Sequence, residues 1–137
     1  MYRYYDEKGM FCNDDIYLYD LKVETMKGAL ERLTYGDTTH DYSYPVWVDN
    51  NNIIFSLNKE GNYELYLMNI INKNTRRLTF TKDVDETRST VSPNSKVIAY
   101  SIDIKNQVSG EIWLMDLETL KTRYLTKGSS PDWSPAQ

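Results

Sequence analysis

The hydrophobic positions of this chain fall into short segments that recur three times and are separated by polar residues. One six-residue stretch of apolar and aromatic residues recurs as Ile16–Leu21, Leu65–Ile70 and Ile112–Leu117. A leucine-threonine pair follows each stretch, as Leu33-Thr34, Leu78-Thr79 and Leu125-Thr126. A third marker follows as Trp47, Val91 and Trp133. Because the markers keep one order at spacings of 42 to 49 residues, they indicate an internal repeat.

Each repeat divides into short strands, because turn-forming Asn, Asp and Gly residues separate its apolar segments. The strands predicted for the second repeat are Tyr44–Val48, Asn52–Leu57, Tyr63–Ile70 and Thr75–Thr79. Those predicted for the third repeat are Arg88–Ser92, Lys96–Ser101, Gly110–Leu117 and Lys121–Thr126. The first repeat has Tyr2–Tyr5, Asp15–Asp20 and Ala29–Thr34 but no opening strand. Pro131–Ser134 is a predicted strand of the missing kind.

One segment of the first repeat conflicts with this pattern. Glu24–Leu33 contains Met, Ala, Leu, Glu and Arg, which are good helix formers. The register of the repeat places a strand at the end of this segment, after an insertion. Agreement across three copies outweighs the propensity of ten residues, so we predict a strand here.

A four-stranded unit of about 40–45 residues is typical of a β-propeller blade. The third repeat carries Ile98-Ala99-Tyr100, Ile112–Leu117 and Leu125-Thr126, and Trp133-Ser134-Pro135 opens a further copy. These motifs resemble the TolB-like, WD-related β-propeller repeat, and the resemblance covers essentially the whole chain. The second repeat departs from it, with Trp47-Val48-Asp49 in place of Trp-Ser-Pro, and the third has Val91 in place of Trp.

We therefore predict an all-β fold, a β-propeller segment of three four-stranded blades formed by residues 1–137. Blade 1 comprises residues 1–34 with the C-terminal strand 129–137, blade 2 residues 35–79 and blade 3 residues 80–128. Propellers close with roughly 4 to 8 blades, and three blades alone leave sheet edges that invite pairing. Propellers that resemble TolB are commonly six-bladed.

The assembly predicted from these edges is a six-bladed homodimer closed by strand exchange. Residues 133–137 followed by residues 1–5 align without a gap with Val91–Tyr100. The C-terminal strand of one chain would then complete the first blade of another. The residues expected at this junction are Tyr2, Tyr4, Pro131, Trp133 and Pro135. The alternative is a fragment of a longer propeller, whose ends fall inside a blade.

Composition and charge narrow the classes of partner. Twelve tyrosines and three tryptophans favour strands over helices, and the net charge of −4 argues against nucleic acid. No apolar run approaches the ~20 residues of a membrane span. No signal-peptide core is visible, so a cytoplasmic location is favoured, or a periplasmic one if a leader has been removed.

Catalytic signals are sparse in this sequence. It contains no Gly-x-Ser-x-Gly, His-Glu-x-x-His or phosphate-binding glycine loop. His40 is the single histidine and is predicted to lie in a loop, and the lone Cys12 excludes an internal disulfide. We therefore predict neither enzymatic activity nor a cofactor.

Candidate binding residues lie in or just before the opening strands, which line the central channel by analogy with other propellers. They are Asp41, Tyr42, Tyr44, Glu86, Arg88 and Ser129. A ring of tyrosine, carboxylate and arginine would suit a peptide or a sugar. Asp83, Asp85 and Glu86 are candidate calcium ligands, since carboxylates suit hard cations; solvated acidic loops are the alternative.

The function predicted from these features is a non-catalytic TolB-like β-propeller module for protein or peptide binding and for self-assembly. Two alternatives stay open. Some proteins with similar repeats are carbohydrate lyases or carry a peptidase domain, so the chain could be a component of such an enzyme. It could also be a propeller fragment with no ligand of its own.

Overall fold

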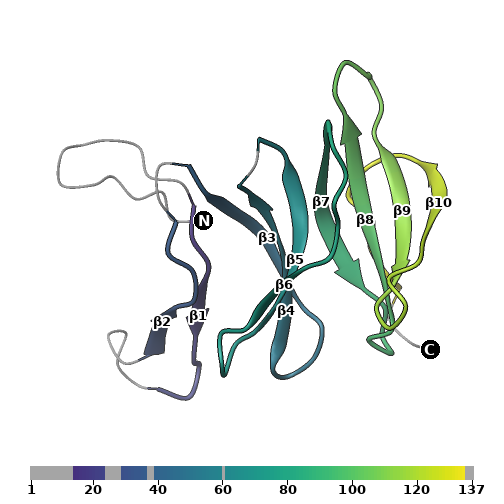
Figure 1. Cartoon of the computed structure of the whole chain (residues 1–137). Helices are drawn as coiled ribbons and strands as arrows, with labels where there is room; N and C mark the ends of the chain where they lie inside the picture. Colours follow the sequence, from purple (N-terminus) through teal and green to yellow (C-terminus); the bar gives the residue numbers. More distant parts are fainter. Residues whose placement is uncertain (1–13, 24–28, 37–38, 60, 135–137) are drawn as a thin grey trace.

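The computed structural model describes residues 14–23, 29–36, 39–59 and 61–134. These residues form an all-β structure of three antiparallel sheets that stand side by side (Figure 1). The first sheet pairs β1 (Tyr17–Tyr19) with β2 (Leu30–Arg32). The second contains β3 (Asp41–Trp47), β4 (Asn52–Asn58), β5 (Tyr63–Asn69) and β6 (Thr75–Arg77). The third contains β7 (Val84–Val91), β8 (Val97–Ile104), β9 (Glu111–Asp116) and β10 (Thr122–Lys127).

The strands expected for the second and third repeats are confirmed, each in chain order across its sheet. Their opening strands begin earlier than predicted, β3 at Asp41 and β7 at Val84. Backbone pairing continues into these residues, with Asp41 opposite Asn58 and Val84 opposite Ile104.

In the first repeat, β1 and β2 lie within the predicted strands Asp15–Asp20 and Ala29–Thr34. The strand at the end of the Glu24–Leu33 segment is therefore confirmed, while residues 24–28 lie outside the described residues. The predicted strand Tyr2–Tyr5 also lies outside them. Pro131–Ser134 forms no ladder with the described residues of its own chain, so its pairing with a second copy stays a prediction.

The hydrophobic core lies between the sheets, because the central strand β4 is buried on both faces. Ile54 of β4 packs with Leu65 and with Ile98 of β8, on the side of the third sheet. Ile53 and Phe55 point the other way and pack with Leu33 and Ile16 of the first repeat. Alternate residues of one strand thus join three sheets. In addition, β7 packs against β3, β4 and β5.

Candidate functional site

Two matching irregularities in the innermost strands form the candidate binding surface. The pairing of β3 with β4 shifts register between Ser43 and Val46, and that of β7 with β8 shifts between Thr87 and Thr90. Within these β-bulges Tyr44 has a φ of 54° and Arg88 a φ of 50°. A bulge re-aims the side chains next to it, and a left-handed residue other than glycine costs free energy that a functional site commonly retains.

The bulges bring Tyr44 and Arg88 together. The guanidinium carbon of Arg88 lies 5.1 Å from the centre of the Tyr44 ring, within the range of a cation–π contact. Arg88 Nη1 also lies 3.5 Å from Asp103 Oδ2, with both side chains more than one-third exposed. At that length the ion pair is weak, so the guanidinium keeps donors that face solvent.

The other residues predicted for the channel are placed differently. Asp41 accepts hydrogen bonds from the Asp14 amide, at 3.1 Å, and from the Tyr63 hydroxyl. Tyr42 is half-buried, 5.8 Å from the Phe55 ring. Glu86 is 1% exposed, whereas Ser129 is exposed. Of the predicted set, the structure therefore gathers Tyr44 and Arg88 at the surface and uses Asp41, Tyr42 and Glu86 within the junctions between sheets.

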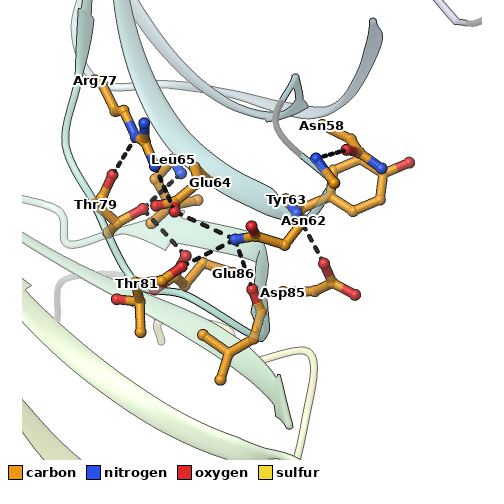
Figure 2. A network of polar contacts seen from close by, with 12 residues as sticks. Asn58, Asn62, Tyr63, Glu64, Leu65, Arg77, Thr79, Thr81, Asp85 and Glu86 are labelled. Carbon is orange, nitrogen blue, oxygen red and sulfur yellow. Dashed lines mark hydrogen bonds and ion pairs between the residues drawn. The ribbon is translucent and has the colours of Figure 1, made fainter. Parts of the chain in front are cut away.

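A buried polar network connects the second sheet to β7 (Figure 2). Arg77 Nη2 lies 2.7 Å from Glu64 Oε1, and Arg77 Nε donates to the Thr79 carbonyl at 2.7 Å. The Thr79 hydroxyl accepts from the Leu65 amide at 2.9 Å and donates to Glu86 Oε2 at 3.2 Å. Burial, the largest cause, and the nearby Glu64 raise the pKa of Glu86 to about 8.

The first repeat contains a similar arrangement, built from Asp15, Arg32 and Thr34, but there the threonine donates to the same acid that the arginine binds. Arg32 pairs with Asp15, and Thr34 Oγ1 accepts from the Ile16 amide at 2.9 Å and donates to Asp15 Oδ1 at 2.9 Å. The sequence signal is an acid before the six-residue stretch and an arginine before the leucine-threonine pair. The six-residue stretch and the leucine-threonine pair do not by themselves predict this network, because its acid and arginine lie just outside them.

The third sheet lacks this arginine, because Tyr124 occupies its position opposite Trp113. The Trp113 indole instead donates to Glu111 Oε2 at 2.8 Å, and its ring meets Tyr124 edge-on. Tyr124 and Leu125 are 48% and 49% exposed. The third sheet thus presents a partly apolar face to solvent. In the second sheet Leu78, the counterpart of Leu125, is only 4% exposed, because β7 and β8 cover it.

The segment after β10 follows the path of an opening strand. The Gly128 amide donates to the Gly110 carbonyl at 2.9 Å, as the Tyr42 amide does to the Asp14 carbonyl at 3.0 Å. Ser130 has a φ of 54° and lies three residues before Trp133, as Tyr44 lies before Trp47 and Arg88 before Val91. Of the predicted assembly residues, Pro131 and Trp133 are half-buried, whereas Tyr2, Tyr4 and Pro135 lie outside the described residues.

The candidate calcium ligands have separate surroundings. Asp85 Oδ1 accepts from the Tyr63 amide at 2.8 Å, Glu86 belongs to the buried network, and Asp83 is exposed with a φ of 63°. In the part of the chain that the structure describes, no three His, Cys, Asp or Glu side chains converge as a metal site. Cys12 lies outside that part.

His40 lies in a loop, as predicted, at a hollow of about 570 Å³ between the first and second sheets. Tyr42, Phe55 and Tyr66 are also among the residues that line this hollow. None of the described residues belongs to a helix long and apolar enough to cross a membrane.

Comparison with known proteins identifies the fold. No family model matches the sequence, and no curated protein matches it. Among solved structures, TolB from Acinetobacter baumannii is 25% identical with a TM-score of 0.64, and the match covers 83% of this chain and 27% of that one. A putative TolB from Agrobacterium tumefaciens is 20% identical with a TM-score of 0.64, covering 90% of this chain and 44% of that one.

An oligogalacturonate lyase in complex with manganese is 21% identical with a TM-score of 0.56, covering 80% of this chain and 29% of that one. Peptidases also match, so the fold is shared by enzymes and by TolB. The chain spans less than half of the length of either TolB structure. Its two four-stranded antiparallel sheets and these matches together show that the chain has a TolB-like β-propeller fold.

Proposed function

We propose that the chain is a non-catalytic propeller module that binds a peptide or protein segment at Tyr44 and Arg88 and assembles with a second copy through its C-terminal strand. The observation that carries the binding role is the pair of bulges in β3 and β7. Two bulky residues hold left-handed conformations there, although glycine would adopt them with no steric cost. Retaining Tyr44 and Arg88 at these positions is understandable if their side chains contact a ligand.

The chemistry of the pair suits a segment with a carboxylate or a carbonyl-rich backbone. The Tyr44 ring holds the planar guanidinium of Arg88 at 5.1 Å, which reduces the entropy that binding would cost. Arginine and tyrosine are also enriched among the residues that dominate binding interfaces. The weak ion pair with Asp103, at 3.5 Å, is readily exchanged for a ligand carboxylate.

Arg88→Gly is expected to weaken peptide binding at least tenfold while leaving the fold intact. The loss of a hydrogen bond to a charged group costs about 1.5–3 kcal/mol, and glycine suits the left-handed conformation. Short random peptides displayed on phage and selected on the wild-type chain would be titrated by fluorescence polarisation, with melting temperatures as the check on folding. Arg76→Ala, the same loss of charge at an exposed position of β6, should leave binding unchanged. Equal losses in both variants would contradict the proposal.

The assembly role is supported by the segment 128–134. It already follows the path of an opening strand, its Trp133 indole donates to the Thr90 carbonyl at 3.2 Å, and it stands beside the exposed face of the third sheet. Three further strands laid on this segment would complete a four-stranded blade. A second copy of the chain supplies such strands if its first repeat docks there, which gives the predicted homodimer of six blades.

One chain has a mass of 16.1 kDa, and light scattering of the intact chain is expected to report twice this mass. Trp133→Ala should weaken the association at least tenfold, because large aromatic residues at the centre of an interface dominate its affinity. Trp47→Ala offers a matched control, since Trp47 is the counterpart in the second sheet and is 51% exposed. A stable, folded monomer at high concentration would contradict the dimer and favour a propeller fragment.

The alternative function is a component of a carbohydrate-active or peptidase-associated enzyme. The match to an oligogalacturonate lyase is the observation that favours it. A rise in melting temperature on adding manganese together with a galacturonide would support this alternative, and a response to selected peptides alone would support the binding module.

A further inference from the structure

Among the described residues, the junction between the second and third sheets contains one more acid with a buried side chain than the junction between the first and second sheets. In both junctions an acid pairs with an arginine, Asp15 with Arg32 and Glu64 with Arg77. Glu86 lies five residues before Val91, and its counterpart five residues before Trp47 is Tyr42. The later junction therefore holds two carboxyl groups for one guanidinium.

These two carboxyl groups are closed off from water. Glu64 is 3% exposed and Glu86 is 1% exposed. Arg77 Nη2 binds Glu64 Oε1 at 2.7 Å, while Glu64 Oε2 is buried and finds no hydrogen-bond donor among the described residues. A buried carboxylate oxygen without a donor is costly. The simplest donor would be a protonated carboxyl group beside it.

Among the described residues, the groups around Glu86 include no second cation. The charged or titratable side chains that face it are Glu64 from β5 and Tyr100 from β8, while Arg77 from β6 is already bound to Glu64. Its other polar neighbours are the hydroxyls of Thr79 and Thr81. The Thr79 hydroxyl has a single proton, which it donates to Glu86 Oε2. Two negative charges enclosed with one positive charge would repel each other.

We propose that Glu86 carries a proton at neutral pH and donates it to Glu64 Oε2, which has no other donor among the described residues, and that this hydrogen bond holds the second and third sheets together. The Glu86 carboxylate takes up a proton from solvent and forms an O–H bond when the junction closes, and this O–H bond breaks and the proton returns to solvent when the junction opens. The junction between the second and third sheets is then more stable at acidic pH. The Asp15–Arg32 junction, where one buried carboxyl group pairs with one arginine, does not depend on pH in this way.

The sign of the pH dependence follows from where the proton is bound. The pKa of Glu86 is raised from 4.5 to about 8 in the folded chain, chiefly by burial. Between these values the folded state holds a proton that the unfolded state has lost. The stabilisation by this group is therefore complete below about pH 4.5 and is lost progressively as the pH rises to about 8.

Urea unfolding measured from pH 6 to pH 9 tests whether the proton on Glu86 stabilises the junction between the second and third sheets. For the wild-type chain the unfolding equilibrium constant should rise by up to tenfold per pH unit below pH 8, the limit for one proton, and level off above it. Glu86→Gln should remove this rise, because the amide donates to Glu64 Oε2 without titrating. Asp85→Asn, a neighbouring acid on the same strand, should keep the wild-type slope. Equal slopes for the wild-type chain and Glu86→Gln would overturn the proposal.

A second measurement decides the matter even if Glu86→Gln does not fold. Carbon-13 NMR of glutamate carboxyl groups in the wild-type chain should show one resonance that titrates near pH 8. Amide exchange in β7, corrected for the intrinsic effect of pH, should accelerate through the same midpoint, while exchange in β3 should not. Titration of every glutamate carboxyl below pH 6 would overturn the proposal.

Discussion

Replacing Arg77 by alanine is expected to lower the free energy of unfolding by about 3–5 kcal/mol, because removing one partner of a buried ion pair leaves the other charge unpaired. Glu64 is 3% exposed and Arg77 is its only cation among the described residues. The side chain of Arg77 also donates to the Thr79 carbonyl and covers the Phe80 ring at 4.7 Å. Native domains are stable by about 5–15 kcal/mol, so this one substitution should come close to unfolding the chain. Urea denaturation followed by circular dichroism measures the loss.

Two control variants distinguish the stabilisation by the buried ion pair from that by an exposed ion pair. Lys73 pairs with Glu31, and both side chains are more than 40% exposed, so Lys73→Ala should cost less than about 1 kcal/mol. Replacing both members of the buried pair, with Arg77→Met and Glu64→Leu, should recover most of the stability, since well-packed apolar residues are often equivalent to a buried pair. A loss for Arg77→Ala no larger than that for Lys73→Ala would show that the network does not stabilise the fold.

The arrangement of strands was predictable from this sequence because each position of the repeat can be compared across three copies. The leucine-threonine pairs and the six-residue stretches predicted the third and fourth strands of each four-stranded sheet to within a few residues. Even the helix-favouring segment before β2 ended in a strand, because pairing with β1 outweighed its local propensity.

The candidate binding surface was predictable only in part, because it depends on bulges. Strict alternation along β3 places Tyr42 and Tyr44 on the same face. The left-handed conformation at Tyr44, with a φ of 54°, breaks the alternation, so Tyr42 packs on Phe55 while Tyr44 meets Arg88. Tyrosine and arginine in a sequence do not indicate a left-handed conformation, whereas glycine or asparagine would.

The role of Glu86 has a similar explanation. Its position before the third marker suggested a channel residue, but its surroundings are set by Glu64, 22 residues earlier, and by Tyr100 on the neighbouring strand. Burial of an acid against another acid is a property of the packed junction. A single sequence contains no local pattern for it.

Phe55→Ala is the second substitution expected to have a large effect, a loss of about 3–5 kcal/mol. The Phe55 side chain is fully buried, stacked at 6.0 Å on the Tyr66 ring and 5.8 Å from the Tyr42 ring. It belongs to the core between the first and second sheets, together with Ile16 and Leu33. Truncation removes apolar contact and leaves a cavity that rigid strands do not refill. Thermal and urea unfolding measure the total loss.

Measuring which strands lose stability in Phe55→Ala tests whether the two clusters of the core stabilise different sheets. In repeat proteins each unit contacts only its neighbours, so stability is a sum over units and junctions. Phe55→Ala should therefore accelerate amide exchange most in β1 and β2, and much less in β8 and β9. Ile98→Ala, a fully buried residue of the other core, should show the reverse pattern, with β7 to β10 losing protection first. If either variant accelerates exchange equally in all sheets, the chain unfolds as one cooperative unit and the two cores are not independent.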